Sequence, residues 1–533
     1  MSFVTLPFFL FVAALTLVYF LVPGKYQWLV LLLGSYVFYW THSRWLALVL
    51  VGTSLATYGI ALWLQRINDR GKAYLKQHAA ELSREEKKAR KEKTKKAARG
   101  VLLLGIAVDL GALLFLKYFN FFAANINSLL VRFGGAGSVP MLSLLLPLGI
   151  SFYTLQAIAY MVDVYRGKEQ ADKNPLKFML FMSFFPQIVQ GPIPRHDQLA
   201  HQLYAPHRFD YTRMCYGVQM MLWGLIKKLS IAERLTGPVN YLFTHSARQM
   251  GPLNLFAAIL YSFQIYTDFS GGMDIGRGVA QILGIELELN FRQPYFSGSI
   301  EEFWRRWHMT MGKWMKDYVF YPLSLSKAFT SLGRTSRKLL GQFIGKRLPA
   351  FIAMFIAYLA VGFWHGPNWK YVAYGIWNGL FIMSGILLDG VYAKCRDGLK
   401  INEQAVTWRV FRILRTFLIV SIGRFFSRSD SLADALTMGR NMFTRWTDIT
   451  FLTNGTLLNI GLDTAEWVVL CIFLLVLFYV DFQHEKQVSF RAVIARQPLV
   501  FRWIIYIGAV LLLLIFGCYG PVYNAADFIY AGF

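Results

Sequence analysis

Apolar stretches of about 20 residues recur along almost the whole chain, and they limit its fold more than any other feature. A helix needs about 20 apolar residues to cross a hydrocarbon core of about 30 Å. Hydrophobic residues make up 56% of the 533 positions and aromatic residues 17%, a composition too apolar for a single water-soluble globule. The pattern predicts an all-α polytopic membrane protein.

Thirteen stretches are candidates for membrane elements, but some are too short to cross alone. The short stretches 27–40, 176–190 and 349–363 fit half-helices or re-entrant segments better than full crossings. We therefore expect about 11 transmembrane or re-entrant helices in a single domain over 1–533. The candidates are 3–22, 27–40, 45–64, 101–122, 141–162, 176–190, 213–233, 253–269, 349–363, 371–392, 408–426, 466–482 and 503–520.

The first apolar stretch is expected to be a retained helix. It begins at Phe3 without a basic segment before it, and no small-residue cleavage site follows before Pro23. The four cysteines, Cys215, Cys395, Cys471 and Cys518, show no paired spacing. Neither a disulfide framework nor a metal site is therefore expected.

The formal net charge of +25 raises the question of a nucleic-acid partner, but its distribution favours membrane topology. Lysine and arginine gather between the apolar stretches; residues 84–99 alone hold nine basic and three acidic residues. The positive-inside rule places 66–100, 326–347 and 484–502 in the cytoplasm, with 66–100 as a solvated helical loop. A second reading is that this basic surface binds anionic lipid, a phosphate-bearing acyl donor or an acidic acyl carrier.

Polar residues at membrane depth concentrate in 263–378, and such residues usually face a bundle interior or a cavity. The stretch "SGGMDIGRG" is not a phosphate loop, because no strand precedes it and no GK[ST] follows. Asp274 and Arg277 are instead expected to form an internal ion pair. The segment 301–321 mixes tryptophans with charges and predicts an interfacial helix, with Glu301, Trp304 and His308 on one face.

"GFWHGPNW" places His365 at the end of the apolar segment 348–363. An imidazole there either satisfies a helix end through hydrogen bonds or transfers protons. Its pKa near 6.5 suits the removal of a proton from a weak nucleophile such as a sugar hydroxyl. Both interpretations are open for His365, whereas His308 is either an interfacial polar residue or a catalytic one.

Six blocks in sequence order resemble the membrane-bound O-acyltransferase family, in particular the bacterial branch that acts in alginate O-acetylation and teichoic acid D-alanylation. The ending "DFIYAGF" is also similar to that branch. The chain departs from the family at Arg424, where an aromatic residue is usual, and in the length of 66–100. The blocks are "PLGISFYTLQAIAYMVDVYRG" (147–167), "FFPQIVQGPIPRHDQ" (184–198), "QIYTDFSGGMDIGRGVAQILGIEL" (264–287), "NFRQPYFSGSIEEFWRRWHMTMGKWMKDYVFYPL" (290–323), "GFWHGPNWKYVAYGIWNG" (362–379) and "LIVSIGRFFSRSDSLADAL" (418–436).

The resemblance implies an O-acyltransferase in which His365 is the deeply buried catalytic histidine and His308 a second, more peripheral one. It implies a central funnel or tunnel, a bacterial inner-membrane location and no tightly bound cofactor. We expect acetyl-CoA or an acyl carrier protein to supply an acyl thioester, most simply acetyl, to an exported polysaccharide. The expected substrate-binding residues are Trp304, Arg305, Trp307, Trp364, Asn368, Asn378, Asp268 and Gln264.

A partner is expected because the chain has no sizeable soluble domain to hold a polymer. It would be an extracytoplasmic acetyltransferase or a polysaccharide synthesis or export complex. D-alanyl transfer to teichoic acids is the alternative within this class. A transporter or flippase is the alternative outside it, although the sequence shows no internal repeat of the kind common in transporters.

Overall fold

The computed structural model describes residues 1–135, 138–446 and 449–519, and within these ranges every regular element is helical. The predicted all-α class is therefore confirmed. The similarity noted at "DFIYAGF" lies outside the described residues. The chain forms two compact units, one of residues 1–218 and 276–288 and the other of residues 219–275 and 289–533. The single domain predicted over 1–533 stays a prediction.

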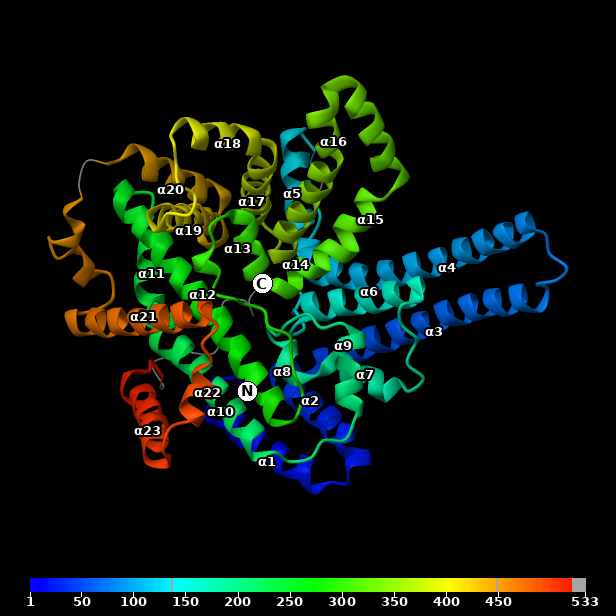
Figure 1. Cartoon of the computed structure of the whole chain (residues 1–533), viewed down its shortest axis with the longest axis horizontal. Coiled ribbons are helices and arrows are strands. Elements are labelled where there is room, and N and C mark those ends of the chain that lie inside the picture. The colour runs from blue at the N-terminus through cyan, green and yellow to red at the C-terminus, as the bar shows by residue number, and fades with distance from the viewer. Residues whose placement is uncertain (136–137, 447–448, 520–533) are drawn as a thin grey trace. The chain divides into compact units, whose positions relative to one another are not determined.

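The first unit contains the N-terminal helices (Figure 1). Leu64, Gly71 and Ala98 are buried where two of these helices meet, whereas most of their polar residues are exposed. The elements are α1 (Leu6–Leu21), α2 (Gln27–Ser43), α3 (Ala47–Gln77), α4 (Arg84–Leu113), α5 (Phe119–Arg132), α6 (Ile150–Arg166), α7 (Pro175–Ser183), α8 (Phe185–Ile188), α9 (His196–Tyr204) and the start of α10 (Tyr211–Leu225).

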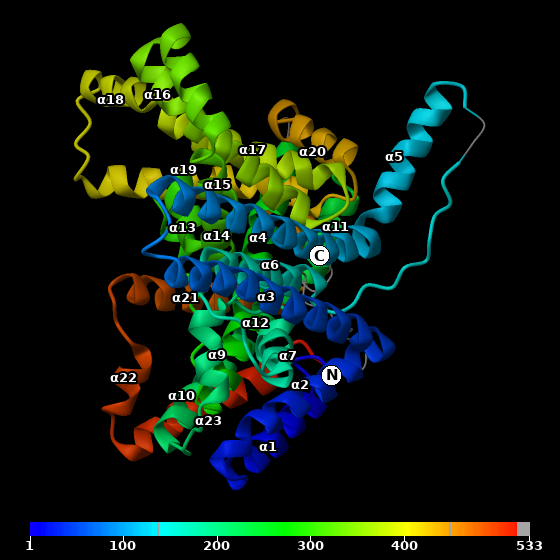
Figure 2. The same ribbon diagram turned by 90° about the vertical axis from the view of Figure 1, so that its right-hand side faces the viewer.

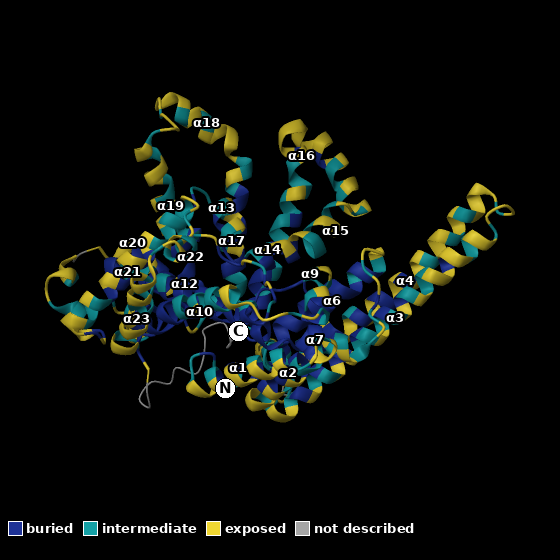
Figure 3. Cartoon of the chain, turned by 60° about the horizontal axis from the view of Figure 1, so that its bottom comes forward, coloured by how far each residue is buried: buried dark blue, intermediate teal, exposed yellow. Residues whose placement is uncertain are grey.

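Helices α3 and α4 form a long antiparallel hairpin, which Figures 1 and 2 show side by side. Gly71 allows close approach, since a Cβ there would lie 2.5 Å from the Thr94 side chain. Ser83 begins α4 with a capping box closed by Glu86. The basic residues of 66–100 line the exposed end of this hairpin (Figure 3). Its predicted helical character is confirmed, while its cytoplasmic side stays a prediction.

The stretch 176–190 is broken into the short helices α7 and α8, and its residues from 180 onward are buried. Pro175 and Pro186 stand at the first turns of the two helices, where a missing N–H costs no hydrogen bond. The prediction of short, broken elements at this place is confirmed. The prediction of a re-entrant segment is not tested.

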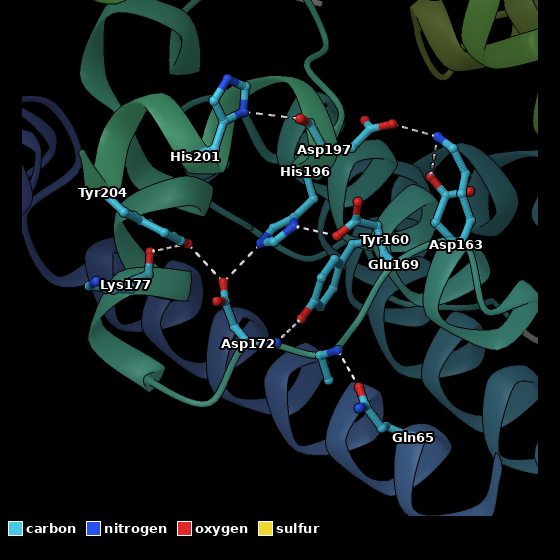
Figure 4. A network of polar contacts seen from close by, with 12 residues as sticks. Gln65, Tyr160, Asp163, Glu169, Asp172, Lys177, His196, Asp197, His201 and Tyr204 are labelled. Carbon is cyan, nitrogen blue, oxygen red and sulfur yellow. Dashed lines mark hydrogen bonds and ion pairs between the residues drawn. The ribbon is translucent and has the colours of Figure 1, made fainter. Parts of the chain in front are cut away.

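A partly buried histidine, His196, ties the loop after α6 to α9 (Figure 4). His196 Nδ1 lies 3.1 Å from Glu169 and Nε2 lies 2.8 Å from Asp172. The Tyr204 hydroxyl also donates to Asp172, over 2.8 Å. Burial by itself lowers the pKa of His196, but the hydrogen bonds and charges of Asp172 and Glu169 outweigh it and raise the pKa above 6.5. The two carboxylates therefore favour the protonated form of His196, and their contacts with the ring brace this loop against α9.

The second unit contains the rest of the chain and all the histidines singled out by the sequence. It begins with the end of α10 and a π-helical segment, Ile226–Ala232. Its further elements are α11 (Thr236–Thr244), most of α12 (Gly251–Ile282), α13 (Ile300–Arg306), α14 (Met309–Met315), α15 (Tyr321–Ser324), α16 (Lys327–His365), α17 (Trp369–Leu387), α18 (Asp389–Gly398), α19 (Val406–Arg428), α20 (Leu432–Thr444), α21 (Thr464–Glu485), α22 (Phe490–Ala495) and α23 (Leu499–Phe516).

Helix α16 consists of two arms joined at Gly341, whose φ of 74° and ψ of 176° are not helical. The arms fold back on each other (Figure 1) because Gly345 permits contact, with the Ser336 hydroxyl donating to its carbonyl over 2.8 Å. One expectation is corrected here. The stretch 349–363 is not a half-helix, because it belongs to an arm that begins after Gly341 and is long enough to cross a membrane. The cytoplasmic side of 326–347 stays a prediction.

Five helical segments of the described residues are long and apolar enough to span a membrane, or six if the bent pair α17 and α18 counts as one span. They are Gly24–Gln77, Arg84–Arg132, Lys327–His365, Thr464–Glu485 and Leu499–Phe516. This supports a multi-pass membrane protein. The figure of about 11 membrane elements and the central tunnel stay predictions.

Candidate active site

His308 lies at a break between α13 and α14, and not within one continuous helix. Trp307 is extended, with φ −103° and ψ 128°, and His308 takes a left-handed conformation, with φ 47° and ψ 53°. A side chain other than glycine in this region is strained by about 1–3 kcal/mol and occurs preferentially at functional sites. The predicted single helical face that joins Glu301, Trp304 and His308 is therefore wrong.

The His308 ring is fully enclosed by aromatic neighbours. Phe269 of α12 packs edge-on at 5.0 Å between ring centroids, and Trp364 of α16 lies at 6.1 Å. His308 is 3% exposed and His365 5%, so both are buried, and the more peripheral position expected for His308 stays a prediction. Burial lowers the pKa of His308 to about 3, and the ring is therefore neutral at physiological pH.

Asn290 holds the His308 turn through both its main chain and its side chain. Its carbonyl accepts a hydrogen bond from the Met309 N–H at 3.0 Å, and its Oδ1 accepts from the Thr310 N–H at 2.9 Å. Its Nδ2 lies 3.1 Å from His308 Nδ1. One asparagine thus links the extended segment before α13 to the first residues of α14.

His365 is the last residue of α16 and lies against α17. Gly362 makes this contact possible, because a Cβ there would lie 2.4 Å from the Tyr371 carbonyl oxygen. The His365 ring is 6.3 Å from Tyr371, nearly parallel to it, and 5.9 Å from Tyr374, edge-on. The glycines of "GFWHG" therefore serve helix packing, and they bring the imidazole into a wall of aromatic rings.

Trp364 joins the two histidines in one cluster, since its ring lies 5.2 Å from that of His365 and 6.1 Å from that of His308. The sequence analysis singled out all three residues, and the fold brings His308, at the start of α14, next to Trp364 and His365 at the end of α16. Two buried imidazoles in an aromatic, water-poor environment can move a proton and donate a hydrogen bond during the same reaction.

Arg424 of α19 lies among the same aromatic rings and is 1% exposed. Its guanidinium packs over Trp307 at 4.2 Å, and Nη1 donates to the Tyr374 hydroxyl at 3.0 Å. Trp307 precedes His308 in the chain, and Tyr374 contacts the His365 ring. Arg424 thereby connects the surroundings of both histidines. The sequence marked this position only as a departure from the family pattern.

Some of the other predicted substrate-binding residues lie next to the two histidines, and the rest make contacts elsewhere in the unit. Trp304, Trp307 and Asn378 join the cluster: Trp304 lies 6.4 Å from the Tyr374 ring, and Asn378 donates to the Tyr374 carbonyl at 2.8 Å. Asn368 caps α17 by accepting from the Lys370 N–H. Arg305 is exposed and pairs with Glu301 at 3.3 Å, at the surface of α13.

Asp268 and Gln264 of α12 are engaged in contacts of another kind. Asp268 lies 2.5 Å from Lys228 Nζ, and Glu233 lies 2.6 Å from the same ammonium. Gln264 donates to the Thr236 hydroxyl at 3.0 Å. These contacts join α12 to the π-helical segment and to α11, and they give both residues a bracing role in this unit. Asp274 pairs similarly with Lys227, at 2.7 Å.

Sequence reasoning missed Asn290 and the role of Arg424. Asn290 opens the block "NFRQPYFSGS", and the resemblance could have singled it out as the first polar residue of that block. Nothing in the local pattern indicates its partners, because His308 and Thr310 lie about 20 residues further along the chain.

Comparison with known proteins finds relatives over most of the chain. A family profile described as MBOAT, membrane-bound O-acyltransferase family, matches residues 171–344. A probable alginate O-acetylase of Pseudomonas aeruginosa is 31% identical over 476 residues, which cover 88% of this chain and 81% of the relative. A peptidoglycan O-acetyltransferase of Helicobacter pylori is 27% identical, over 64% of each chain.

A teichoic acid D-alanyltransferase of Streptococcus thermophilus is 31% identical over a shorter region, 47% of this chain and 59% of the relative. The similarity to the alginate relative extends over most of both chains. The chain is therefore a multi-pass membrane protein of the membrane-bound O-acyltransferase family, and an O-acyltransferase by activity.

Proposed function

We propose that this protein moves an acetyl group from a cytosolic thioester to hydroxyl groups of an exported cell-surface polysaccharide, or to a partner acetyltransferase. The observation that carries the proposal is the burial of His308 and His365 in one aromatic cluster. The relatives named for alginate and peptidoglycan O-acetylation support acetyl as the group and a polysaccharide as the acceptor.

In the proposed reaction, the acceptor hydroxyl oxygen attacks the thioester carbonyl carbon. The new C–O bond forms, the C–S bond breaks, and the products are an ester and a free thiol. His365 takes the hydroxyl proton during attack and returns it to the leaving sulfur, so the enzyme ends unchanged. A hydrogen-bond donor at the carbonyl oxygen stabilises the negative charge that develops there.

The proposed donor is acetyl-CoA or an acyl carrier protein, and the proposed location is the bacterial inner membrane. Activated acyl groups are made in the cytosol, whereas the acceptor polymer is finished outside. A tunnel through the membrane domain would allow both to reach His365. The proposed partner on the outer side is an extracytoplasmic acetyltransferase or a polysaccharide synthesis or export complex, because the sequence predicts no sizeable soluble domain that could hold a polymer.

Mass spectrometry of exported polysaccharides from cells with and without this protein tests the proposal. We expect O-acetyl groups to disappear in its absence and to return with the wild-type gene but not with His365→Ala. Loss of D-alanine from teichoic acids would establish the alternative acyl group, which the shorter similarity to a D-alanyltransferase supports less strongly. Loss of the polymer with unchanged acylation of the remainder would contradict the proposal.

A further inference from the structure

The orientation of the Asn290 amide follows from its contacts with Thr310. Oδ1 lies 2.9 Å from the Thr310 backbone nitrogen and 2.9 Å from its hydroxyl. A backbone N–H can only donate, so the Asn290 atom that faces it must be the carbonyl oxygen. The amide nitrogen Nδ2 is thereby directed to the other side, where the His308 ring lies.

The amide orientation decides the tautomer of His308. Nδ2 of Asn290 lies 3.1 Å from His308 Nδ1, whereas Oδ1 lies further away, at 3.4 Å, and already accepts from Thr310. An amide NH₂ donates, so Nδ1 accepts and carries no proton. In a neutral imidazole the proton then sits on Nε2. Nε2 is therefore a donor in this arrangement and not a base.

We propose that Asn290 is a positioning residue that holds His308 as a neutral imidazole with its proton on Nε2, so that His308 donates a hydrogen bond to the thioester carbonyl oxygen. This inference rests on the proposed acyl transfer. It divides the work between the two histidines: His365 accepts the hydroxyl proton, and His308 stabilises the oxyanion without giving up its own proton.

The left-handed backbone of His308 fits this role. Three hydrogen bonds to Asn290 hold the turn: one from the Met309 N–H to the main-chain carbonyl, and two from the Thr310 N–H and hydroxyl to Oδ1. Together they offset the strain at φ 47°. The imidazole is thus fixed both in position and in protonation state before any substrate binds, as transition-state stabilisation by a preorganised donor requires.

The test compares wild type with Asn290→Asp, a change of nearly equal size that replaces the donating NH₂ with a carboxylate oxygen. An acceptor at that place draws the proton to Nδ1 and leaves a lone pair on Nε2. The readout is the ¹⁵N spectrum of histidine-labelled protein in detergent, with His308 assigned by its loss in His308→Gln. We expect protonated Nε2 in wild type and protonated Nδ1 in Asn290→Asp.

Acetylation in cells should fall about 10- to 100-fold in Asn290→Asp, the size of loss expected when a reacting group is held in the wrong arrangement. Asn459→Asp, the same change at an exposed position, should leave it unchanged. Protonated Nδ1 in wild type would overturn the proposal, and so would more than half of wild-type acetylation in a variant with the switched tautomer. If wild type acetylates nothing, the proposed function fails, and the wild-type spectrum still decides the tautomer.

Discussion

Replacing Lys228 with methionine should destabilise the protein strongly at neutral pH. The ammonium lies 2.5 Å from Asp268 and 2.6 Å from Glu233, and the side chains of Lys228 and Asp268 are no more than 2% exposed. Methionine keeps the length of the side chain but leaves two acidic groups without this cation. Removing one partner of a buried ion pair typically costs about 3–5 kcal/mol.

Protonation limits the loss and makes it depend on pH. Protonating a carboxylate with a pKa near 4 costs about 4 kcal/mol at pH 7 and about 1.4 kcal/mol at pH 5. A buried carboxylate that has lost its cation can take up a proton instead of keeping its charge. The destabilisation by Lys228→Met should therefore be about 3–5 kcal/mol at pH 7 and should become several-fold smaller at pH 5.

The assay is the melting midpoint of the purified protein in detergent at pH 7 and pH 5. Lys394→Met removes an exposed lysine and should melt like wild type at both pH values. Adding Asp268→Asn and Glu233→Gln to Lys228→Met should restore most of the lost stability, because the uncompensated charges are gone. A Lys228→Met midpoint equal to that of wild type at pH 7, or a difference that grows as the pH falls, would refute the reasoning.

Further predictions concern the site, the first unit and the topology. His365→Ala should abolish acyl transfer without loss of membrane insertion, and His308→Ala should reduce it by at least about 100-fold; product at half the wild-type level from an inserted variant would contradict either role. Arg424→Met should lower acetylation about 10- to 100-fold in protein that is still inserted, because Trp307 and Tyr374 lose the guanidinium that links them; equal losses of activity and stability would indicate a purely structural role. Because the pKa of His196 is raised in the folded state, protonation of its ring stabilises the fold fully below pH 6.5, and this contribution disappears as the pH rises through the folded-state pKa. The difference in melting midpoint between wild type and His196→Gln should therefore shrink from pH 6 to pH 9. A difference that stays constant would exclude an ionic contribution of His196. Single cysteines placed in 66–100 or 326–347 should not react with an impermeant thiol reagent in intact cells, and labelling of either would reverse the predicted orientation.

The sequence by itself predicted that the chain lies in a membrane and that its fold is all-α. It also singled out His308 and His365 as candidate site residues. Membrane helices are recognisable in a sequence because lipid offers no hydrogen bonds, so every backbone N–H and C=O must be bonded within the helix. A spanning segment is therefore one continuous helix, and its apolar residues follow one another in the chain. His365 and His308 stand in long, ordered blocks of family resemblance, which identified them without any knowledge of their distance. The short helices in 176–190 also followed from the sequence, since the apolar run there is too short to cross.

Tertiary structure decided what surrounds those histidines. The break at Trp307–His308 interrupts a segment whose local pattern favours one helix, because three hydrogen bonds to the distant Asn290 stabilise a left-handed turn there. Local sequence does not distinguish Arg424 from other basic residues. Only the packing of α19 shows that its guanidinium lies over Trp307. The sequence analysis named Asp268 as a substrate-binding residue, and only the fold shows that Lys228 lies next to it. In each case the deciding contact joins residues far apart in the chain, and local spacing carries no information about which distant side chain will supply a donor, a charge or an aromatic face.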